Sequence, residues 1–522
     1  MAFSKALLVA TLLAACWGCA LSYKILVLVP MFAKSHHNLG KGVADTLHEK
    51  GHEITFVNCF PSAKTPYREI GLTELFELKD ESMAGFDTAL SSSTNIFKLL
   101  STVLPQIAEK TLQNKEVQKL LNDPSEKFDL VVSDHFMIDV FHAFALKFNC
   151  PLVLLSPTGL THMLARDTGN PISPATIPNV FRSFTGEMTL IQRVANTAMA
   201  VALELMNKFL FTPPQEPLYK KYFPAEAARM PYSELRTRVA AVLINTHSSI
   251  GTPRPLLPNA IEIGGFHIGP IKPLPKDLQE ILDNAKNGAI FFSMGSNLKS
   301  KMLPVETREA ILRSLSKLKQ TILWKFETDL PGKPDNVVIR DWLPQTAILA
   351  HKNVHLFISH GGLLSCIEAA STGVPLLAIP IFGDQHYNAK ATQERGHGLT
   401  LQYSNITETT LTATLNELLT NDKYTKKAQE IHRLFHDRPI SPRDLLTFSV
   451  EHVIRTGGAA HLAPPKVSLC SLLLLDVAAV VLLPPLLVFL AIWCYCKKRR
   501  CCKTKEEQNK STQDKKTQKK NI

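Results

Sequence analysis

The feature that most limits how this chain can fold is a series of short apolar runs separated by helical stretches. Lys24–Pro30 (KILVLVP) and Phe128–Asp134 (FDLVVSD) are almost continuously apolar, which is typical of strands buried on both faces. Similar runs occur at His52–Val57, Pro151–Ser156, Val239–Thr246, Gly288–Ser296, Gln320–Phe326, Asn336–Arg340, Val354–Ser359 and Pro375–Pro380. Strands that alternate with helices form parallel sheets covered on both sides, so the sequence predicts an α/β fold.

A proline-rich stretch, Thr252–Pro275, divides this alternation into two halves. We interpret residues 251–275 as a linker and predict two tandem Rossmann-like domains, at residues 23–250 and 276–465. The helices expected between the strands include Leu39–Lys50, Val305–Leu318, Leu364–Thr372, Thr409–Thr420 and Leu445–Arg455. A further helical region, Glu187–Phe211, is apolar but interrupted by charges. A core helix, the wall of an acceptor pocket and a membrane-facing helix all fit that pattern.

Both ends of the chain carry membrane-targeting patterns. Residues 1–22 combine Lys5, a ten-residue apolar stretch and small residues before a cleavage point, so they are identified as a signal peptide. Residues 473–496 include twenty uncharged residues, enough for a helix to cross the hydrocarbon core of a bilayer. The segment 497–522 begins with four consecutive basic residues, which the positive-inside rule places in the cytosol. The sequence therefore predicts a single-pass type I membrane protein with a luminal body.

Most of the net charge of +12 lies in that tail. The eleven basic and three acidic residues of Lys497–Ile522 contribute +8, so the other 496 residues carry only +4. A nucleic-acid-binding face on the body is therefore not expected. Only Cys59, Cys150, Cys366 and Cys470 lie between the two ends. Their scatter argues against a disulfide framework, and their spacing suggests no zinc site.

The most informative region for function is Trp342–Gln385. Seven of its residues form a spaced pattern: Trp342, Gln345, His360, Ser365, Glu368, Asp384 and Gln385. This pattern resembles the donor-binding signature of family 1 UDP-sugar glycosyltransferases, the group that includes the UDP-glucuronosyltransferases. The resemblance covers most of the body. The signal peptide, single span and terminal KKNI, a dilysine-type retention signal, match the membrane-bound animal members. The sequence DVAAVVLL at the start of the span most resembles the insect branch.

The resemblance implies a role for each position. Trp342 would stack on uracil, a contact worth about 1–3 kcal/mol for bases on aromatic side chains. Gln345 would bond the ribose or the base edge, and Glu368 would accept hydrogen bonds from the ribose hydroxyls. Ser293, Ser296, His360, Gly361 and Gly362 would surround the diphosphate, because glycines let the backbone approach and a helix N-terminus supplies N–H donors.

Two further positions would hold the sugar. Asp384 and Gln385 would bond its hydroxyl groups. Leu364 departs from the family pattern, since many relatives have asparagine there near the phosphates, whereas the neighbouring Ser365 keeps a hydroxyl.

The catalytic base is expected from the first domain. The family's catalytic histidine follows the first strand in a Ser-His-aromatic pattern; here Ser35-His36 match, but His37 replaces the aromatic residue. His36 is the better match, and His37 stays an alternative. Asp134 ends another strand of the same sheet and would orient the imidazole. Both positions follow strand carboxyl ends, where parallel sheets bind ligands.

Together these features predict a GT-B enzyme that has two Rossmann-like domains facing a cleft and a C-terminal membrane helix. It would move a hexose or glucuronic acid from a UDP-sugar to a hydroxyl of a small lipophilic acceptor, with inversion. No metal and no cofactor are expected. A homo-oligomer is compatible with the sequence. Detoxification in the endoplasmic reticulum membrane and a glycan on Asn405 are also expected. The alternatives are a non-catalytic type I partner or receptor, and a nicotinamide dehydrogenase, although GGFHIG at Gly264–Gly269 lacks the dehydrogenase context.

Overall fold

The computed structural model describes residues 22–78, 93–296, 300–464 and 468–518. It forms two compact units, a body that ends at Pro464 and a C-terminal unit from Pro465, and each is described by itself. Residues 1–21 of the predicted signal peptide lie outside the described residues. So do Lys519 and Lys520 of the dilysine pattern.

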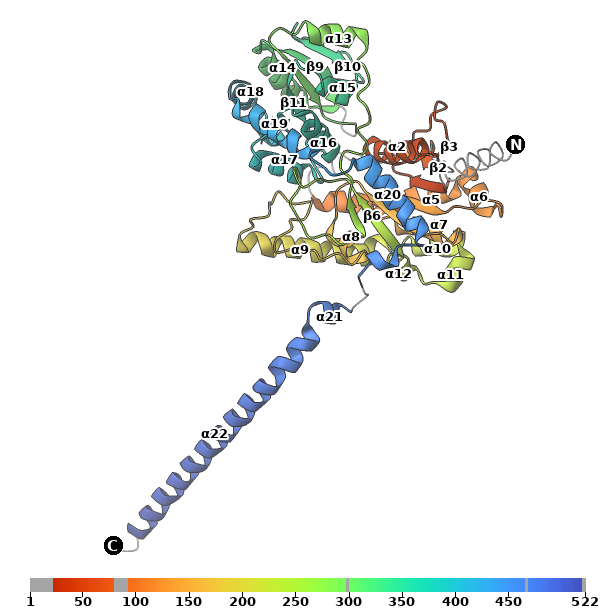
Figure 1. Cartoon of the computed structure of the whole chain (residues 1–522). Coiled ribbons are helices and arrows are strands. Elements are labelled where there is room, and N and C mark those ends of the chain that lie inside the picture. Colours follow the sequence, from red (N-terminus) through yellow and green to blue (C-terminus); the bar gives the residue numbers. More distant parts are fainter. Residues whose placement is uncertain (1–21, 79–92, 297–299, 465–467, 519–522) are drawn as a thin grey trace, which may run out of the picture. The chain divides into compact units, whose positions relative to one another are not determined.

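The body contains two parallel sheets (Figure 1). The first has seven strands in the order β3-β2-β1-β4-β5-β6-β7. Its strands are β1 (Lys24–Val29), β2 (Glu53–Asn58), β3 (Arg68–Gly71), β4 (Leu130–Asp134), β5 (Leu152–Ser156), β6 (Val239–Ile244) and β7 (Ala260–Glu262). Its helices and helical turns are α2 (Lys34–Glu49), α5 (Ser93–Gln113), α6 (Lys115–Asn122), η1 (Asp139–His142), α7 (Ala143–Lys147), α8 (His162–Asp167), α9 (Leu190–Met206), η2 (Asn207–Phe211), α10 (Glu216–Tyr222), α11 (Pro224–Arg229) and α12 (Tyr232–Leu235).

The second sheet has six strands in the order β10-β9-β8-β11-β12-β13. They are β8 (Ala289–Ser293), β9 (Thr321–Lys325), β10 (Val337–Arg340), β11 (Val354–Ser359), β12 (Leu376–Ala378) and β13 (Gly398–Thr400). The accompanying helices and turns are α13 (Lys276–Asp283), η3 (Ser300–Met302), α14 (Val305–Ser316), α15 (Gln345–Leu349), α16 (Leu363–Thr372), α17 (Gln385–Glu394), η4 (Tyr403–Asn405), α18 (Glu408–Thr420), α19 (Lys423–His436), α20 (Pro442–Arg455) and η5 (Ala460–Leu462).

The apolar runs form strands because both faces of each sheet are covered. In β1, Leu26 and Leu28 belong to one hydrophobic cluster, whereas Ile25 and Val27 belong to another on the opposite face. Strand side chains alternate between the two faces, so a strand buried on both sides must be apolar throughout. All ten predicted strands are present. The strands that the sequence analysis missed, β3, β7 and β13, have three or four residues each and lie at sheet edges.

The predicted domain boundaries need two corrections. First, the linker proposed at 251–275 contains β7, which pairs with β6 at the edge of the first sheet. Second, the segment 276–465 does not belong entirely to the second domain, because α20 returns to the first. Leu446, Val450 and Val453 are buried in the same cluster as β1, and Lys50 Nζ lies 2.8 Å from Asp444 Oδ1. The apolar face of α20 covers the first sheet, which the order of segments along the chain does not reveal.

In both sheets the strand order reverses at one point, between β1 and β4 in the first and between β8 and β11 in the second. Loops after these neighbouring strands run to opposite sides, which opens a crevice at their carboxyl ends where such folds bind ligands. The structure therefore indicates a site built from the segments that follow these four strands.

The C-terminal unit contains α21 (Leu469–Leu472) and the long helix α22 (Leu475–Gln518). Among the described residues, α22 is the one helix long and apolar enough to cross a membrane, with a mean hydropathy of 2.6 in its most apolar window. The helix α22 contains residues 475–496 of the predicted span 473–496. It continues without a break into the basic segment from Lys497, which was predicted as a separate tail.

Candidate active site

A cavity of about 460 Å³ lies at the crevice and is lined by residues of both domains. This volume is within the range of sites that bind small molecules. The sequence-predicted residues that line it are His36, Ser293, Ser296, Trp342, Gln345, His360, Gly362, Ser365, Glu368, Asp384 and Gln385. Asp134 and Gly361 do not line the cavity. Asp134 contacts His36, and Gly361 lies in the sequence between His360 and Gly362, all three of which line it. The motif and the first-domain histidine, which are more than 300 residues apart in sequence, are thus brought together.

His36 and Asp134 form a buried pair at this cavity. His36 lies in the first turn of α2, Asp134 ends β4, and β4 lies beside β1. The distance from His36 Nδ1 to Asp134 Oδ2 is 2.7 Å. The ring of Phe136 meets the imidazole edge-on, with 5.0 Å between ring centroids. With Nδ1 held by the carboxylate, the Nε2 atom of His36 is the one available for proton transfer.

His37, the alternative base, lies in a different environment. Its ring packs against Phe56 and Phe60, and it does not line the cavity. Burial, reinforced by the charges of Lys34 and Lys41, lowers the pKa of His37 to about 4. The imidazole is therefore neutral and directed into the core of the first domain, where it cannot reach a substrate in the cavity.

The positions predicted to bind the diphosphate surround one partly buried imidazole. His360 lies between Gly295 and Gly362: a Cβ atom on Gly295 would come within 2.6 Å of His360 Cε1, and one on Gly362 within 2.5 Å of Nε2. Gly362 is the N-cap of α16. Burial, with a contribution from Lys325, lowers the pKa of His360 to about 4. A neutral histidine and a helix N-terminus together direct N–H donors to the position expected for an anion.

The positions predicted to bind the nucleoside combine an exposed indole with a hydrogen-bonded group. The side chain of Trp342 is 58% exposed, so its indole is a free surface on the cavity rather than part of the core, where Trp324 is fully buried. Gln345 Nε2 lies 3.2 Å from Ser365 Oγ and also donates to a carboxylate oxygen of Glu368. Burial raises the pKa of Glu368 to about 7. The amide thus fixes the carboxylate before any substrate is bound.

The two positions assigned to the sugar differ in the structure. Asp384 Oδ2 accepts a hydrogen bond of 2.8 Å from Asn388. Burial raises the pKa of Asp384, and the hydrogen bond from Asn388 acts in the opposite direction. The Oε1 atom of Gln385, in contrast, accepts hydrogen bonds from the backbone N–H groups of Ile381 and Phe382. Only the amide nitrogen of Gln385 is therefore free to reach a sugar.

The sequence analysis missed two parts of the site. Lys325 ends β9 and lines the cavity, and its Nζ donates to Gly295 O at 3.1 Å and to Glu327 Oε1 at 3.0 Å. A single lysine that ends an apolar strand was the available signal. The second part is an apolar wall from the first domain: Leu99, Leu100, Val103, Leu104, Ile107, Met163, Phe181 and Leu203. Five of these residues lie on α5, and the other three lie on α8, on α9 and in the loop between them. Leu203 belongs to Glu187–Phe211, for which the wall of an acceptor pocket was one of the interpretations, but no single sequence pattern groups all eight residues.

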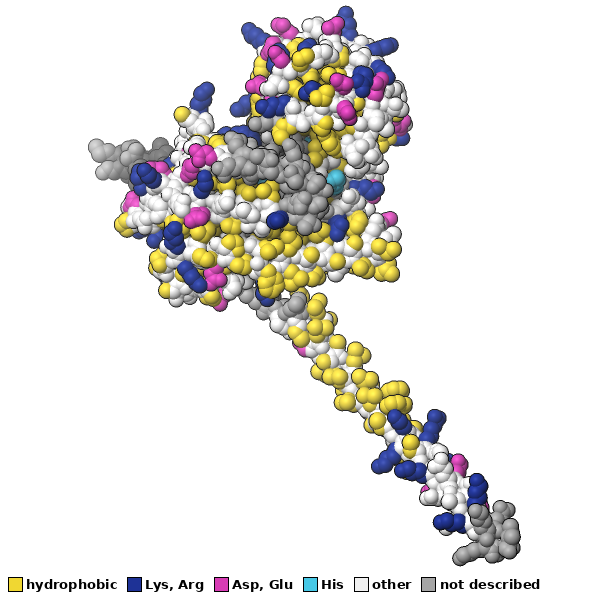
Figure 2. Space-filling view, turned by 180° about the vertical axis from the view of Figure 1, so that it is seen from behind, with side chains coloured by type: hydrophobic (Ala, Val, Ile, Leu, Met, Phe, Trp, Pro, Cys, Tyr) yellow, Lys and Arg dark blue, Asp and Glu magenta, His cyan; other side chains and the backbone are white. Residues whose placement is uncertain are grey.

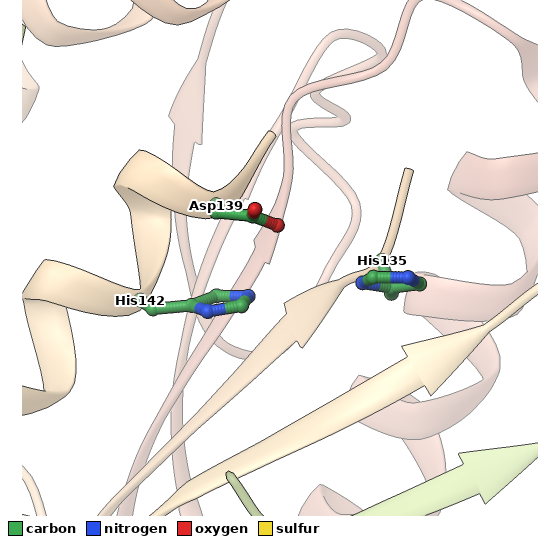
Figure 3. Close-up of side chains that lie close together, drawn as sticks. All are labelled: His135, Asp139 and His142. Atoms are coloured by element: carbon green, nitrogen blue, oxygen red, sulfur yellow. The ribbon is translucent and has the colours of Figure 1, made fainter. Parts of the chain in front are cut away.

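A second group of potential ligands, His135, Asp139 and His142, follows Asp134 in the sequence, and His135 lines the cavity (Figure 3). Their ligand atoms lie within 4.8 Å of one another. However, Arg236 Nε is 3.2 Å from Asp139 Oδ2, and Arg236 also pairs with Asp167. A guanidinium at this distance repels a metal cation bound to the same carboxylate. The group is therefore best described as part of a buried ion-pair network. Asn405, the predicted glycosylation position, is exposed in η4, outside the cavity.

Comparison with known proteins agrees with this arrangement. The family model "UDP-glucoronosyl and UDP-glucosyl transferase" matches residues 24–510. The chain is similar to UDP-glycosyltransferase UGT5 of Dactylopius coccus, at 34% identity over 91% of both chains. It is also similar to a UDP-glucuronosyltransferase of Pleuronectes platessa, at 34% identity over 77% of this chain and 85% of the relative.

Solved structures resemble the body in fold. The glycosyltransferase VinC in complex with DTDP superposes with a TM-score of 0.54 at 18% identity, covering 83% of this chain and 99% of that one. LpCGTa in complex with UDP superposes with a TM-score of 0.52 at 18% identity, covering 83% and 100%. These similarities confirm the predicted GT-B fold, and the relatives do not favour the dehydrogenase or the receptor. The chain belongs to the UDP-glucuronosyl and UDP-glucosyl transferase family and is an enzyme that transfers a sugar from a UDP-sugar.

Proposed function

We propose that this enzyme moves a hexose or glucuronic acid to a hydroxyl group of a small lipophilic acceptor, with inversion at the anomeric carbon. The observation that carries the proposal is the His36–Asp134 pair, 2.7 Å apart, at the same cavity as the donor motif. His36 Nε2 would take the hydroxyl proton while the oxygen attacks the anomeric carbon. The bond from that carbon to the diphosphate breaks, and UDP leaves from the opposite face.

Asp134 has two tasks in this scheme. Its carboxylate holds Nδ1–H of His36, so the correct nitrogen faces the acceptor, and it stabilises the imidazolium that forms as the proton arrives. General-base catalysis of this kind contributes about 10²–10⁴-fold to the rate.

The leaving diphosphate would be stabilised by groups that this chain itself supplies. They are the N–H donors at the start of α16, the imidazole of His360, the hydroxyls of Ser293 and Ser296, and the ammonium of Lys325. Preorganised donors of this type stabilise developing negative charge without reorganisation. We therefore expect transfer without a metal or other cofactor, and full activity in the presence of a chelator such as EDTA.

The apolar wall supports a lipophilic acceptor. Eight apolar side chains of the first domain line the cavity, and burial of apolar surface contributes about 25 cal/mol per Å². One relative is named 2-hydroxyacylsphingosine 1-beta-galactosyltransferase and is 30% identical over 89% of this chain. Relatives named for glucosyl, galactosyl and glucuronosyl transfer all match, so both UDP-glucose and UDP-glucuronate need testing as donors.

For the location we propose the endoplasmic reticulum membrane, with the body in the lumen, α22 as anchor and the basic end in the cytosol. The support is the length and apolarity of α22 and the four basic residues from Lys497 to Arg500. A signal peptide at residues 1–22 and a glycan on Asn405 belong to the same proposal, as does a role in detoxification.

The test is release of UDP by the purified full chain with a phenolic acceptor. His36→Ala should abolish transfer and leave UDP-sugar binding almost unchanged, because His36 contributes to the chemistry and not to the nucleotide site. Asp134→Asn should also be severely impaired, since an amide cannot stabilise the imidazolium equally. His37→Ala is the control for local structure. Loss of transfer in His37→Ala with retention in His36→Ala would overturn the assignment of the base, and absence of UDP release from the wild type with either donor would refute the proposed reaction.

A further inference from the structure

The sequence GGFHIG at Gly264–Gly269 is a motif that the donor and acceptor positions described above leave without a role. It follows β7, and its second glycine, Gly265, has a φ of 92°, a backbone conformation that glycine adopts most readily. Phe266 is buried in a hydrophobic cluster of the first sheet, whereas Ile268 packs on a cluster that includes residues of α16 and α19. His267 stands between these two anchors, so it lies where the two domains meet.

His267 has an unusual environment among the histidines of the chain. There are 18 of them, and the face of the body in Figure 2 shows many charged side chains but few histidines, so burial alone does not distinguish this one. Its side chain is 5% exposed. In the described part of the chain, it is the one histidine with both ring nitrogens buried and without a hydrogen-bond partner. Such groups cost free energy, so a folded protein that retains one generally has a use for it.

The imidazole faces the carboxylate of Glu368. His267 Nε2 lies 3.9 Å from Glu368 Oε1, and the side chain of Glu368 is 12% exposed. Two hydrogen bonds through one water molecule span about 4.5 Å, so the two atoms face each other directly. The second oxygen of the carboxylate, Oε2, accepts a hydrogen bond from Gln345. His267 and Gln345 therefore approach different oxygens of one carboxylate.

The protonation state of His267 suits a donor to that carboxylate. Burial lowers the pKa of His267 to about 4, so the imidazole is neutral at pH 7 and carries one N–H. With this hydrogen on Nε2, a shift of about 1 Å brings the group to hydrogen-bond distance from Glu368 Oε1.

The same residue touches the helix that carries the catalytic base. A Cβ atom on Gly42 of α2 would lie 3.2 Å from both Cα and Cβ of His267, so α2 packs closely on this part of the chain. His36 lies in the first turn of α2. His267 is thus held in place by the first domain while its ring faces a carboxylate of the second.

We propose that His267 is a positioning residue of the donor site: its Nε2–H donates to Glu368 Oε1 and, together with Gln345, orients the carboxylate to receive the two ribose hydroxyls. This role rests on the assignment of Glu368 to the ribose within the proposed function. His267 does not line the cavity, so it acts on the nucleotide through Glu368. A donor to a carboxylate favours the charged form, which accepts from both hydroxyls.

The first experiment measures which part of the nucleotide depends on His267. Calorimetric titrations of the full chain at pH 8 compare UDP with 2′,3′-dideoxy-UDP, which lacks both ribose hydroxyls. His267→Leu should weaken UDP by about tenfold, as expected for loss of a hydrogen bond to a charged group, and should leave the affinity for the dideoxy nucleotide unchanged. His267→Gln, whose amide nitrogen reaches a similar distance from the backbone, should restore most of the affinity for UDP. Equal losses for the two nucleotides would overturn the proposal.

The second experiment tests whether His267 acts through Glu368. In a chain that already carries Glu368→Gln, the further change His267→Leu should cause no additional loss of UDP affinity, because the carboxylate that it orients is absent. A residue that only supports the fold would cause the same loss in both backgrounds. Additive losses in this cycle would therefore contradict the positioning role.

His397→Leu is the matched control. His397 is also buried, at 3% exposure, and its Nδ1 has no hydrogen-bond partner. It immediately precedes β13, at the edge of the sheet opposite the carboxyl ends of the strands. This variant should bind both nucleotides like the wild type, and a loss equal to that of His267→Leu would assign the effect to removal of a buried histidine in general.

The two assignments can fail separately. A loss of UDP affinity in Glu368→Gln without one in His267→Leu would refute the role of His267 alone. Wild-type affinity in Glu368→Gln would refute the assignment of Glu368 to the ribose, and the role of His267 with it. The proposed reaction itself is measured by UDP release from the wild type, which is a separate readout.

Discussion

Glu368 shows how a single side chain can connect substrate binding to pH. It accepts a hydrogen bond from Gln345 at a partly buried position, and desolvation by the surrounding protein raises the pKa of Glu368 to about 7. The carboxylate is the form that accepts two hydrogen bonds from ribose hydroxyls, so binding should favour ionisation and release a proton. At neutral pH the residue is divided between its two forms before the nucleotide arrives.

The affinity for UDP-sugar should therefore rise with pH through about 7. Because the pKa of Glu368 in the folded protein is raised to about 7, the carboxylate is the minor form at pH 6 and the main form at pH 8. Between pH 8 and pH 6 the affinity should fall by about tenfold, the change in the ionised fraction. Calorimetry with a UDP-sugar, whose diphosphate does not titrate in this range, measures the change. Glu368→Gln should bind weakly at all pH values without a slope, and an unchanged slope in that variant would refute the assignment.

Trp342 and Asp384 should separate recognition of the nucleotide from positioning of the sugar. An indole on uracil holds substrate and transition state alike, so Trp342→Ala should mainly raise the Michaelis constant for the donor and weaken UDP itself. Asp384→Ala should mainly lower turnover, because hydroxyl contacts at the reacting ring decide the attack geometry. UDP lacks the sugar, so its affinity for Asp384→Ala should stay close to the wild-type value. Equal losses of UDP affinity in calorimetry would contradict the role of Asp384.

At the scale of secondary structure, the sequence predicts those strands that are buried on both faces. The strands β1 and β4 are recognisable because they are covered on both faces, whereas β7 at a sheet edge has only Ala260 buried. The donor motif is readable because its residues follow three strands, β10, β11 and β12, that are consecutive in the sequence. The sequence predicted a sugar contact for Gln385 but not that its side-chain oxygen accepts a hydrogen bond from the backbone N–H of Ile381. Lys325 ends β9, outside the donor motif, and the apolar wall combines α5 with residues of three other segments, so the full set depends on contacts that no single local pattern encodes.

The return of α20 to the first domain has a measurable effect on stability. Leu446 is fully buried against the first sheet, whereas Phe448 on the same helix is 54% exposed. Leu446→Ala should lower the free energy of unfolding by about 2–5 kcal/mol, and Phe448→Ala by less than about 0.5 kcal/mol. Denaturant unfolding of the full chain in detergent measures both. Hydrogen exchange should increase in peptides of β1 and α2, and an increase confined to the second domain would contradict the packing.

For the whole molecule, contacts between the two domains keep the donor and acceptor halves of the cavity together. Ile250 packs with Ile367 and Phe435, and the hydroxyl of Tyr387 lies 2.8 Å from Thr252 Oγ1. These contacts lie beside the cavity rather than within it, so the His36–Asp134 pair and the donor motif are held opposite each other by the fold.

The proposed topology predicts where glycans attach. Asn405, exposed in the body, should be glycosylated when the chain is made in a secretory system, and Asn509, beyond the span in α22, should not. Protease added to sealed microsomes should remove the end of α22 and spare the body. Mass shifts after glycosidase treatment and immunoblots of the protected fragment provide the readout. A protected C-terminus would reverse the orientation, while Lys519→Ser/Lys520→Ser should let part of the enzyme reach later compartments.

The return of α20 also sets the order of events during biosynthesis. A chain that emerges N-terminus first presents β7 before α20, and the complete second domain lies between them. At about 5–20 residues per second, the missing helix follows roughly 10–40 s later. During that interval one apolar face of the first sheet has no cover, although the strands that form it are already made. The donor domain can thus mature first, and the acceptor domain needs protection by chaperones, in the lumen for the topology proposed above, until the last helix arrives.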